Sequence, residues 1–172
     1  SGLSSLNAHT MEFEQFWPDP DKQSYFGPNY IRDLCTSSTG NLWIATMHGG
    51  LVSFDTRTHE FTFHRESEEN PGGVPASGLM CVIEDSSGAV WTGSLGGLYR
   101  YFPGNQEHAS RHTRYYHDPM KQSSISADMV GDLIMDHSGK LWIATGGGGL
   151  NKLDIESGEF VHYTTREGLH SN

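Results

Sequence analysis

The sequence predicts an all-β protein, a β-propeller fragment of about three and a half four-stranded antiparallel blades. Two observations support this prediction. Three segments that end at Trp43, Trp91 and Trp142 align with one another without gaps, and each runs on into a Gly-Gly-Leu triplet. The 172 residues also include 21 glycines and 11% aromatic residues but only 19% charged residues. This composition favours short strands joined by many turns.

The spacing of the repeats locates one insertion. The three tryptophans lie 48 and 51 residues apart. From the leucine of each Gly-Gly-Leu triplet to the next strand, the chain runs 10, 14 and 10 residues, so the middle unit gains four residues near positions 103–110. The middle unit is also one residue shorter between its tryptophan and its triplet. These two changes account for the longer second interval.

Each unit contains four strand-like segments with turn residues between them. In the first complete unit these segments are residues 31–35, 42–46, 51–55 and 61–64. The Ser-Ser-Thr-Gly sequence at 37–40 predicts a tight hairpin, because glycine takes a positive φ without steric cost. A helical solenoid would need a sustained helical period, and the sequence has none.

The same repeat frame accounts for both ends of the chain. Leu3 and Phe13 match Leu51 and Phe61 at an offset of 48 residues. Natural propellers close with about 4–8 blades, so the fragment is expected to join remaining blades or to self-associate through exposed blade faces. The predicted organisation is the last two strands of a preceding blade (1–16), three complete blades (31–64, 79–116 and 130–163) and the start of a connection to a following blade (164–172).

Composition argues against several other classes of protein. The chain has 11 Lys and Arg against 21 Asp and Glu, a formal net charge of −10, so a phosphate backbone would be repelled and no nucleic-acid partner is expected. No apolar run reaches the roughly 18 residues of a membrane helix. Cys35 and Cys81 are too few for a disulfide framework. We expect no cofactor.

Two segments show a family resemblance. Residues 40–51 read Gly-Asn-Leu-Trp-Ile-Ala-Thr-Met-His-Gly-Gly-Leu, and residues 139–150 follow the same pattern. This pattern resembles the two-component regulator propeller repeat, which is typical of extracytoplasmic sensor regions of hybrid two-component histidine kinases of the Bacteroidetes type. Ser37 departs from that repeat, since the corresponding residues are aspartates at Asp85 and Asp136.

The resemblance implies a ligand-sensing segment of a periplasmic two-component sensor. Such a segment would recognise an oligosaccharide and signal to a histidine kinase elsewhere in the parent protein, which is anchored in the inner membrane. The chain itself would not be an enzyme. It has no G-x-S-x-G or H-E-x-x-H motif, and the strand spacings of His108, His112 and His117 do not converge on a metal.

Two alternatives remain open. Virginiamycin B lyase-like propellers also carry Gly-x-Leu-Trp repeats, with a metal and a catalytic histidine in the central channel, and His48 would then be the candidate. The other alternative is purely structural, in which the fragment only supplies blades to a larger propeller.

Residues that every unit shares are expected to serve packing, because packing makes the same demand of each blade. A tryptophan at one position of every unit can bury about 150–250 Å² against the next blade. The triplet glycines allow a turn and a close backbone approach. The structural residues predicted in this way are Trp43, Trp91, Trp142, Gly50, Gly97 and Gly149.

Ligand-binding residues are expected where the units differ, on the face where the loops between second and third strands open beside the starts of the inner strands. Arg32, beside Tyr30 and His48, would suit a sugar acid or a sulfate, because a guanidinium binds anions with two parallel hydrogen bonds. The ligand-binding candidates are Tyr30, Arg32, Met47, His48, Met80 and Leu95.

Overall fold

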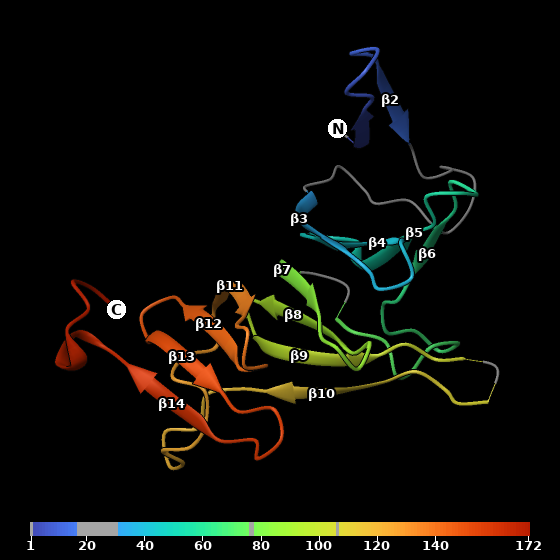
Figure 1. Cartoon of the computed structure of the whole chain (residues 1–172). Helices are drawn as coiled ribbons and strands as arrows, with labels where there is room; N and C mark the ends of the chain where they lie inside the picture. Colours follow the sequence, from blue (N-terminus) through green and yellow to red (C-terminus); the bar gives the residue numbers. More distant parts are fainter. Residues whose placement is uncertain (1, 17–30, 76–77, 106) are drawn as a thin grey trace.

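The computed structural model describes residues 2–16, 31–75, 78–105 and 107–172, and these residues form an all-β structure (Figure 1). Fourteen strands and one 3-10 helix lie within these ranges. The predicted fold class is therefore confirmed. The strands form one hairpin and three four-stranded antiparallel sheets.

Each four-stranded sheet follows the order of the chain, with every strand antiparallel to the next. We refer to these sheets as blade 1, blade 2 and blade 3. The hairpin consists of β1 (Leu3–Leu6) and β2 (Phe13–Phe16); blade 1 of β3 (Ile31–Thr36), β4 (Leu42–Thr46), β5 (Gly50–Phe54) and β6 (Phe61–Phe63); blade 2 of β7 (Leu79–Glu84), β8 (Val90–Ser94), β9 (Gly97–Phe102) and β10 (Arg111–Tyr115); and blade 3 of β11 (Val130–Met135), β12 (Leu141–Thr145), β13 (Gly149–Leu153) and β14 (Phe160–Tyr163), which the 3-10 helix η1 (Thr165–Glu167) follows.

The first turn of each blade is fixed by a short polar residue and a glycine. In blade 2 the Asp85 carboxylate accepts the backbone N–H of Ser87 at 2.8 Å, and the N–H of Gly88 donates to the Asp85 carbonyl at 2.9 Å. Gly88 has a φ of +80°, a conformation that other residues reach only with strain. The chain therefore reverses direction at this turn, and β7 pairs with β8.

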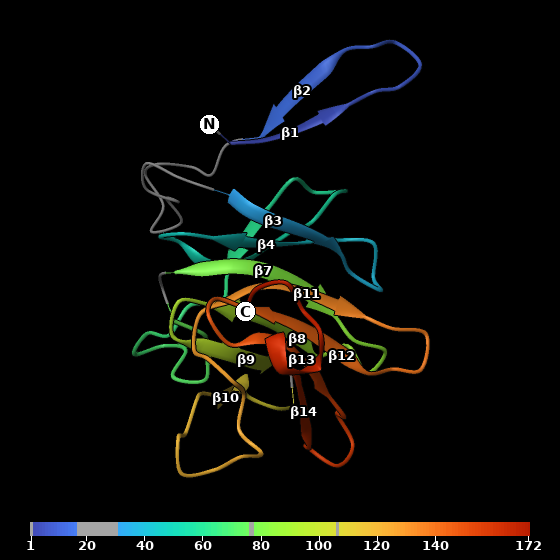
Figure 2. The ribbon, with the colours of Figure 1, turned by 90° about the vertical axis from the view of Figure 1, so that its left-hand side faces the viewer.

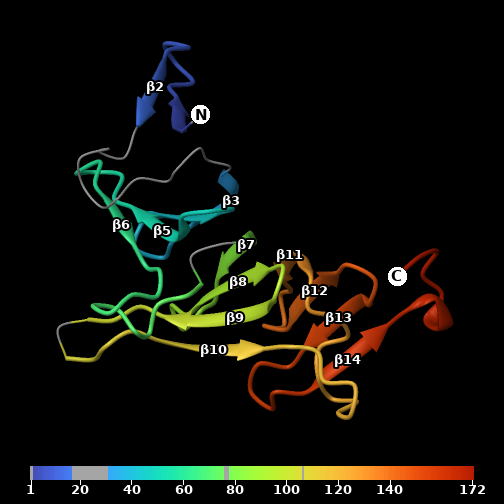
Figure 3. The same ribbon diagram turned by 180° about the vertical axis from the view of Figure 1, so that it is seen from behind.

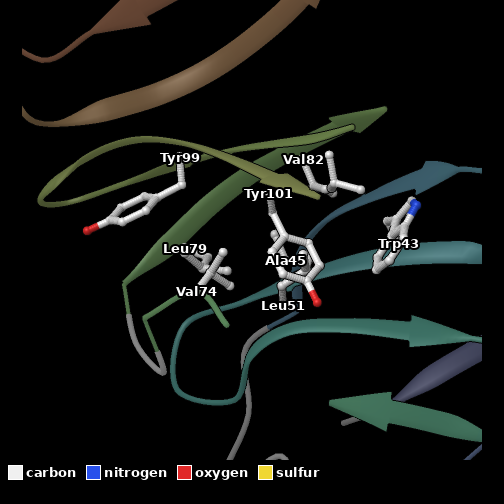
Figure 4. Close-up of a cluster of buried hydrophobic side chains, with 9 residues drawn as sticks. Trp43, Ala45, Leu51, Val74, Leu79, Val82, Tyr99 and Tyr101 are labelled. Carbon is white, nitrogen blue, oxygen red and sulfur yellow. The ribbon is translucent and has the colours of Figure 1, made fainter. Parts of the chain in front are cut away.

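The blades stack face to face, with their inner strands β3, β7 and β11 side by side (Figure 2). Apolar side chains fill each space between sheets. Figure 4 shows the cluster between blades 1 and 2, where Trp43 and Ala45 of blade 1 face Val82 and Tyr101 of blade 2. A second cluster joins blades 2 and 3, and a third joins the β1–β2 hairpin to blade 1.

The outer face of blade 3 differs from the faces that a neighbour covers. Trp43 and Trp91 are buried, whereas Trp142 at the same repeat position is only half-buried. Ala45 is fully buried, but Ala144 is exposed. The positions of blade 3 that correspond to Trp43, Trp91 and Ala45 are thus more exposed, whereas in blades 1 and 2 they pack against the next blade.

Candidate functional site

The inner strands carry an irregularity at the start of each blade. The register of β3 with β4 shifts between Ile31 and Asp33, so that Arg32 has no residue opposite it. The same shift places Met80 out of register in β7 and Gly131 in β11. Such bulges turn a side chain away from the regular alternation and are common beside ligand sites. Two predicted ligand residues, Arg32 and Met80, therefore occupy bulges.

Backbone hydrogen bonds join two of the predicted loops at the boundary of blades 1 and 2. The N–H of Gly78 donates to the Met47 carbonyl at 2.8 Å, and the N–H of Leu95 donates to the Gly78 carbonyl at 3.0 Å. Gly78 has a φ of +79°, and Met80 follows it by two residues. The structure thus gathers Met47, Met80 and Leu95 around Gly78.

The two candidate polar residues are exposed. Within the described ranges, the side chains of Arg32 and His48 have no hydrogen-bonding or ion-pair partner. Met47 and Met80 are half-buried, and Leu95 is exposed. Tyr30 lies outside the described residues. The arrangement offers a guanidinium for an anionic group and flexible apolar side chains for packing, and no described residue orients His48 as a catalytic base.

The shared glycines lie against the outer strands. A Cβ atom on Gly97 would lie 2.6 Å from the Tyr115 carbonyl oxygen, and one on Gly149 would meet the Tyr163 carbonyl oxygen. Gly50, in the same position, has a φ of +74°. Only glycine permits this approach without a backbone shift.

The tryptophans of blades 2 and 3 share one polar environment. The Trp91 indole donates to Asp85 at 2.9 Å, and Arg100 pairs with Asp85 at 3.1 Å while its guanidinium lies 5.0 Å from the centre of the Trp91 ring. Tyr115 stacks on the same ring. Burial acts to raise the pKa of Asp85, but hydrogen bonds from Ser87 and Trp91 outweigh it and the pKa lies below its usual value.

Blade 3 repeats this environment in a more exposed form. The Trp142 indole donates to Asp136 at 2.8 Å, Lys152 lies over the ring, and Tyr163 stacks on it. Hydrogen bonds from Ser138 and Trp142 hold the pKa of Asp136 well below its usual range. An aspartate, a cation and a tyrosine therefore surround each of these two tryptophans.

Blade 1 lacks all three of these partners. The Trp43 indole donates instead to Glu84 of blade 2 at 2.6 Å, and Glu84 also accepts the N–H of Ser38 at 3.0 Å. His64 takes the place of the tyrosine, with its ring centre 4.9 Å from that of Trp43. The Trp43 indole thus donates its hydrogen bond to a carboxylate of the neighbouring blade, whereas Trp91 and Trp142 donate to an aspartate of their own blade.

His64 makes a second link between the same blades. Its ring nitrogens lie 2.8 Å from the Ser53 hydroxyl and 3.1 Å from the Tyr101 hydroxyl of blade 2. Burial lowers the pKa of His64 to about 4, so the ring is neutral near pH 7. Neither Glu84 nor His64 was among the predicted site residues, although Ser37, Ser53 and His64 all differ from the corresponding residues of the other two blades.

These geometries define the class of protein. Four-stranded antiparallel sheets stacked face to face, with their inner strands adjacent, are blades of a β-propeller. Within that class, residues 25–48 match the family model described as "Two component regulator propeller". None of the curated proteins compared with the chain matches it in sequence.

Solved structures show the same similarity over most of the chain. One is the extracellular domain of a protein from B. thetaiotaomicron described as a hybrid two-component system; it is 26% identical over 83% of this chain, with a TM-score of 0.67. The match spans 20% of that domain, so the aligned part of this chain corresponds to about a fifth of its length. Virginiamycin B lyase from Staphylococcus aureus is 14% identical over 93% of this chain and 47% of its own, with a TM-score of 0.61.

These similarities differ in what they establish. At 14% identity the lyase shares the fold alone, whereas the extracellular domain, at 26% identity, is similar in both fold and sequence. The chain is therefore a propeller segment that resembles extracellular sensor domains of two-component systems. Its described residues contain no helix that is long and apolar enough to cross a bilayer.

Proposed function

We propose that this chain is part of the periplasmic ligand-binding region of a two-component sensor, that it recognises an oligosaccharide, and that the parent protein passes the signal to a histidine kinase. The observation that carries this proposal is the similarity to an extracellular domain of a hybrid two-component system, over 83% of the chain. The matching repeat supports it. In this proposal the segment itself is not catalytic.

The proposed ligand site is the face around Gly78. Arg32 supplies a positive charge in a chain whose formal net charge is −10, and its guanidinium has no partner among the described residues. A carboxylate or sulfate on a sugar would supply one. We assign Tyr30, Arg32, Met47, His48, Met80 and Leu95 to this site.

The experiment is calorimetry with acidic oligosaccharides (oligogalacturonides and sulfated oligosaccharides). We expect a measurable heat of binding, and Arg32→Gln should weaken the affinity at least tenfold. Arg57→Gln is the matched control, since Arg57 is an exposed arginine on the β5–β6 turn. Equal losses in both variants would contradict a specific role for Arg32.

Two other outcomes would favour the alternatives. Turnover of a cyclic depsipeptide that is lost in His48→Ala would indicate a lyase-like enzyme. If the chain binds no oligosaccharide and gains no thermal stability with any, the purely structural interpretation is supported.

A further inference from the structure

A groove separates the outer parts of blades 1 and 2, far along the sheets from the inner strands. It has a volume of about 960 Å³ and lies between the loop that follows β6 and the β9–β10 turn. Figure 3 shows this long turn reaching past the sheet edge beside that loop. The corresponding space between blades 2 and 3 measures about 220 Å³.

The difference in volume follows from the insertion. The β9–β10 turn contains the four additional residues that distinguish the middle unit, whereas the β13–β14 turn of blade 3 is short. The longer turn provides a second wall, opposite the loop at residues 65–73. The four-residue insertion in the β9–β10 turn therefore creates the groove. The shorter β13–β14 turn is sufficient for the packing of blade 3 against blade 2.

Both walls are fixed in position. The Ser110 hydroxyl donates to the Asn70 side chain, and the Gly72 carbonyl lies 3.2 Å from a ring nitrogen of His112. A backbone bridge joins Arg65 to Val74. In the opposite wall, the Asn105 side chain accepts the backbone N–H of His108 at 2.8 Å. Walls that are already ordered lower the entropic cost of binding a ligand.

The floor of the groove is polar and neutral. Phe61 and Phe63 of β6 pack on the opposite face of blade 1, with Phe54, and the Tyr101 ring is fully buried. The side chains of Thr62 and His64 remain as the floor among the lining residues. His64 is held by the Tyr101 and Ser53 hydroxyls, so the floor offers a hydroxyl and an imidazole in a fixed arrangement.

Charge restricts the ligands that this groove can accept. Glu68 and Glu69 line it and are exposed, while Arg65, the one cation among the lining residues, lies over the Phe63 ring. Glu66 and Glu107, both exposed, flank the walls. An anionic ligand would be repelled, in contrast to the face around Arg32. Carboxylates and amides are suited to accept and donate hydrogen bonds with hydroxyl groups.

We propose that this groove is a second binding site, which takes a short neutral oligosaccharide. The sugar hydroxyls would donate to Glu68 and Glu69 and exchange hydrogen bonds with the amides of Asn70 and Asn105. A volume of about 960 Å³ lies at the upper end of the range of about 300–1,000 Å³ for ligand pockets. The location rests on the groove itself, whereas the oligosaccharide class rests on the function proposed above.

The test uses calorimetry on the whole chain with neutral gluco-, manno-, xylo-, galacto- and fructo-oligosaccharides of four to six units as probes (about the size that fills such a groove). At least one probe should bind. Replacing residues 102–111 by the residues of 154–159, which shortens the turn by four, should abolish that binding. The double variant Glu68→Gln/Glu69→Gln should weaken it at least tenfold.

Controls separate this inference from the function proposed above. Glu156→Gln/Glu159→Gln makes the same charge change on the short turn of blade 3 and should leave binding intact, as should Arg32→Gln. If a neutral probe binds and the short-turn chain, with unchanged thermal stability, still binds it, the groove is not the site. If no neutral probe binds, the inference is wrong, while binding of acidic oligosaccharides that depends on Arg32 would leave the proposed function standing.

Discussion

Blades 1 and 2 place a tryptophan at the same position but satisfy it differently. Trp91 has Asp85, Arg100 and Tyr115 around it, all from blade 2. Trp43 has His64 from its own blade and Glu84 from the next. Blade 1 has neither the in-blade aspartate nor the cation, and the Glu84 carboxylate accepts the hydrogen bond of the indole in place of that aspartate. The repeat therefore conserves the burial of the ring, while its polar partners can move to the neighbouring blade.

The largest expected effect is on the free energy of unfolding. It distinguishes the contribution of burying a tryptophan ring from that of its polar partners. Trp142 keeps an aspartate, a lysine and a tyrosine as partners, but it is half-buried and none of the blades among the described residues covers it. Trp91→Ala should lower the free energy of unfolding by about 3–5 kcal/mol, because a fully buried ring leaves a cavity. Trp142→Ala should cost less than half of this. Urea unfolding measures both, and equal losses would show that the polar partners dominate.

The second prediction concerns His64 of blade 1 and the pH dependence of the free energy of unfolding. His64 has a pKa of about 4 in the folded chain, below its ordinary value of 6.5, because of burial. The unfolded chain therefore binds the additional proton, and stability that is complete above pH 6.5 is lost as the pH falls toward 4. The loss attributable to His64 is about 3 kcal/mol.

His64→Phe isolates this contribution. The variant loses the hydrogen bonds of the ring at every pH, but its stability should change less between pH 6.5 and 4 than that of the parent chain. Urea unfolding at several pH values gives the comparison. Parallel curves for the two proteins would show that His64 does not titrate in this window.

A third prediction compares the two junctions near the inner strands. Asp33 of blade 1 accepts the N–H of Val82 at 2.9 Å, and Ala45 packs nearby. The corresponding residues of blade 2 are Cys81 and Gly93, and a Cβ on Gly93 would lie 2.6 Å from the Cys81 sulfur and also meet Val130. Gly93→Ala should cost about 1–3 kcal/mol through overpacking. Cys81→Ala in the same chain should recover part of this loss, and thermal unfolding of both variants tests it.

The smallest expected effect concerns Glu84. Glu84→Gln should cost about 1 kcal/mol, because a charge-assisted hydrogen bond from Trp43 becomes a neutral one. Ser37→Asp should recover stability only when combined with Glu84→Gln, since it restores the in-blade acceptor without placing two carboxylates at one indole. Glu159→Gln serves as the control. Additive effects of the two substitutions in a double-mutant cycle would contradict this coupling.

Much of the fold could be predicted from the repeat. Residues 42–46 were expected as a strand and form β4, and the expected segment 61–64 differs from β6 by one residue. The bulges at Arg32 and Met80 could not be predicted, because each falls at the second residue of its strand, where too few residues precede it to show a change in the side-chain alternation. The partnership of Trp43 with Glu84 spans 41 residues between blades, and the groove depends on two loops meeting in space. Neither can be predicted from spacing alone.

The open face of blade 3 has an energetic consequence. Among the described residues, the main contacts between sheets join neighbouring blades. The stability of the stack therefore approximates a sum of single-blade terms and nearest-neighbour coupling terms. Residues such as Trp142 and Ala144 form one side of a further interface between blades, which would contribute another coupling term if a blade packed against it. A longer chain that adds one blade after blade 3 should therefore gain a fixed increment of stability, and its unfolding should become more cooperative with each blade added until the ring closes.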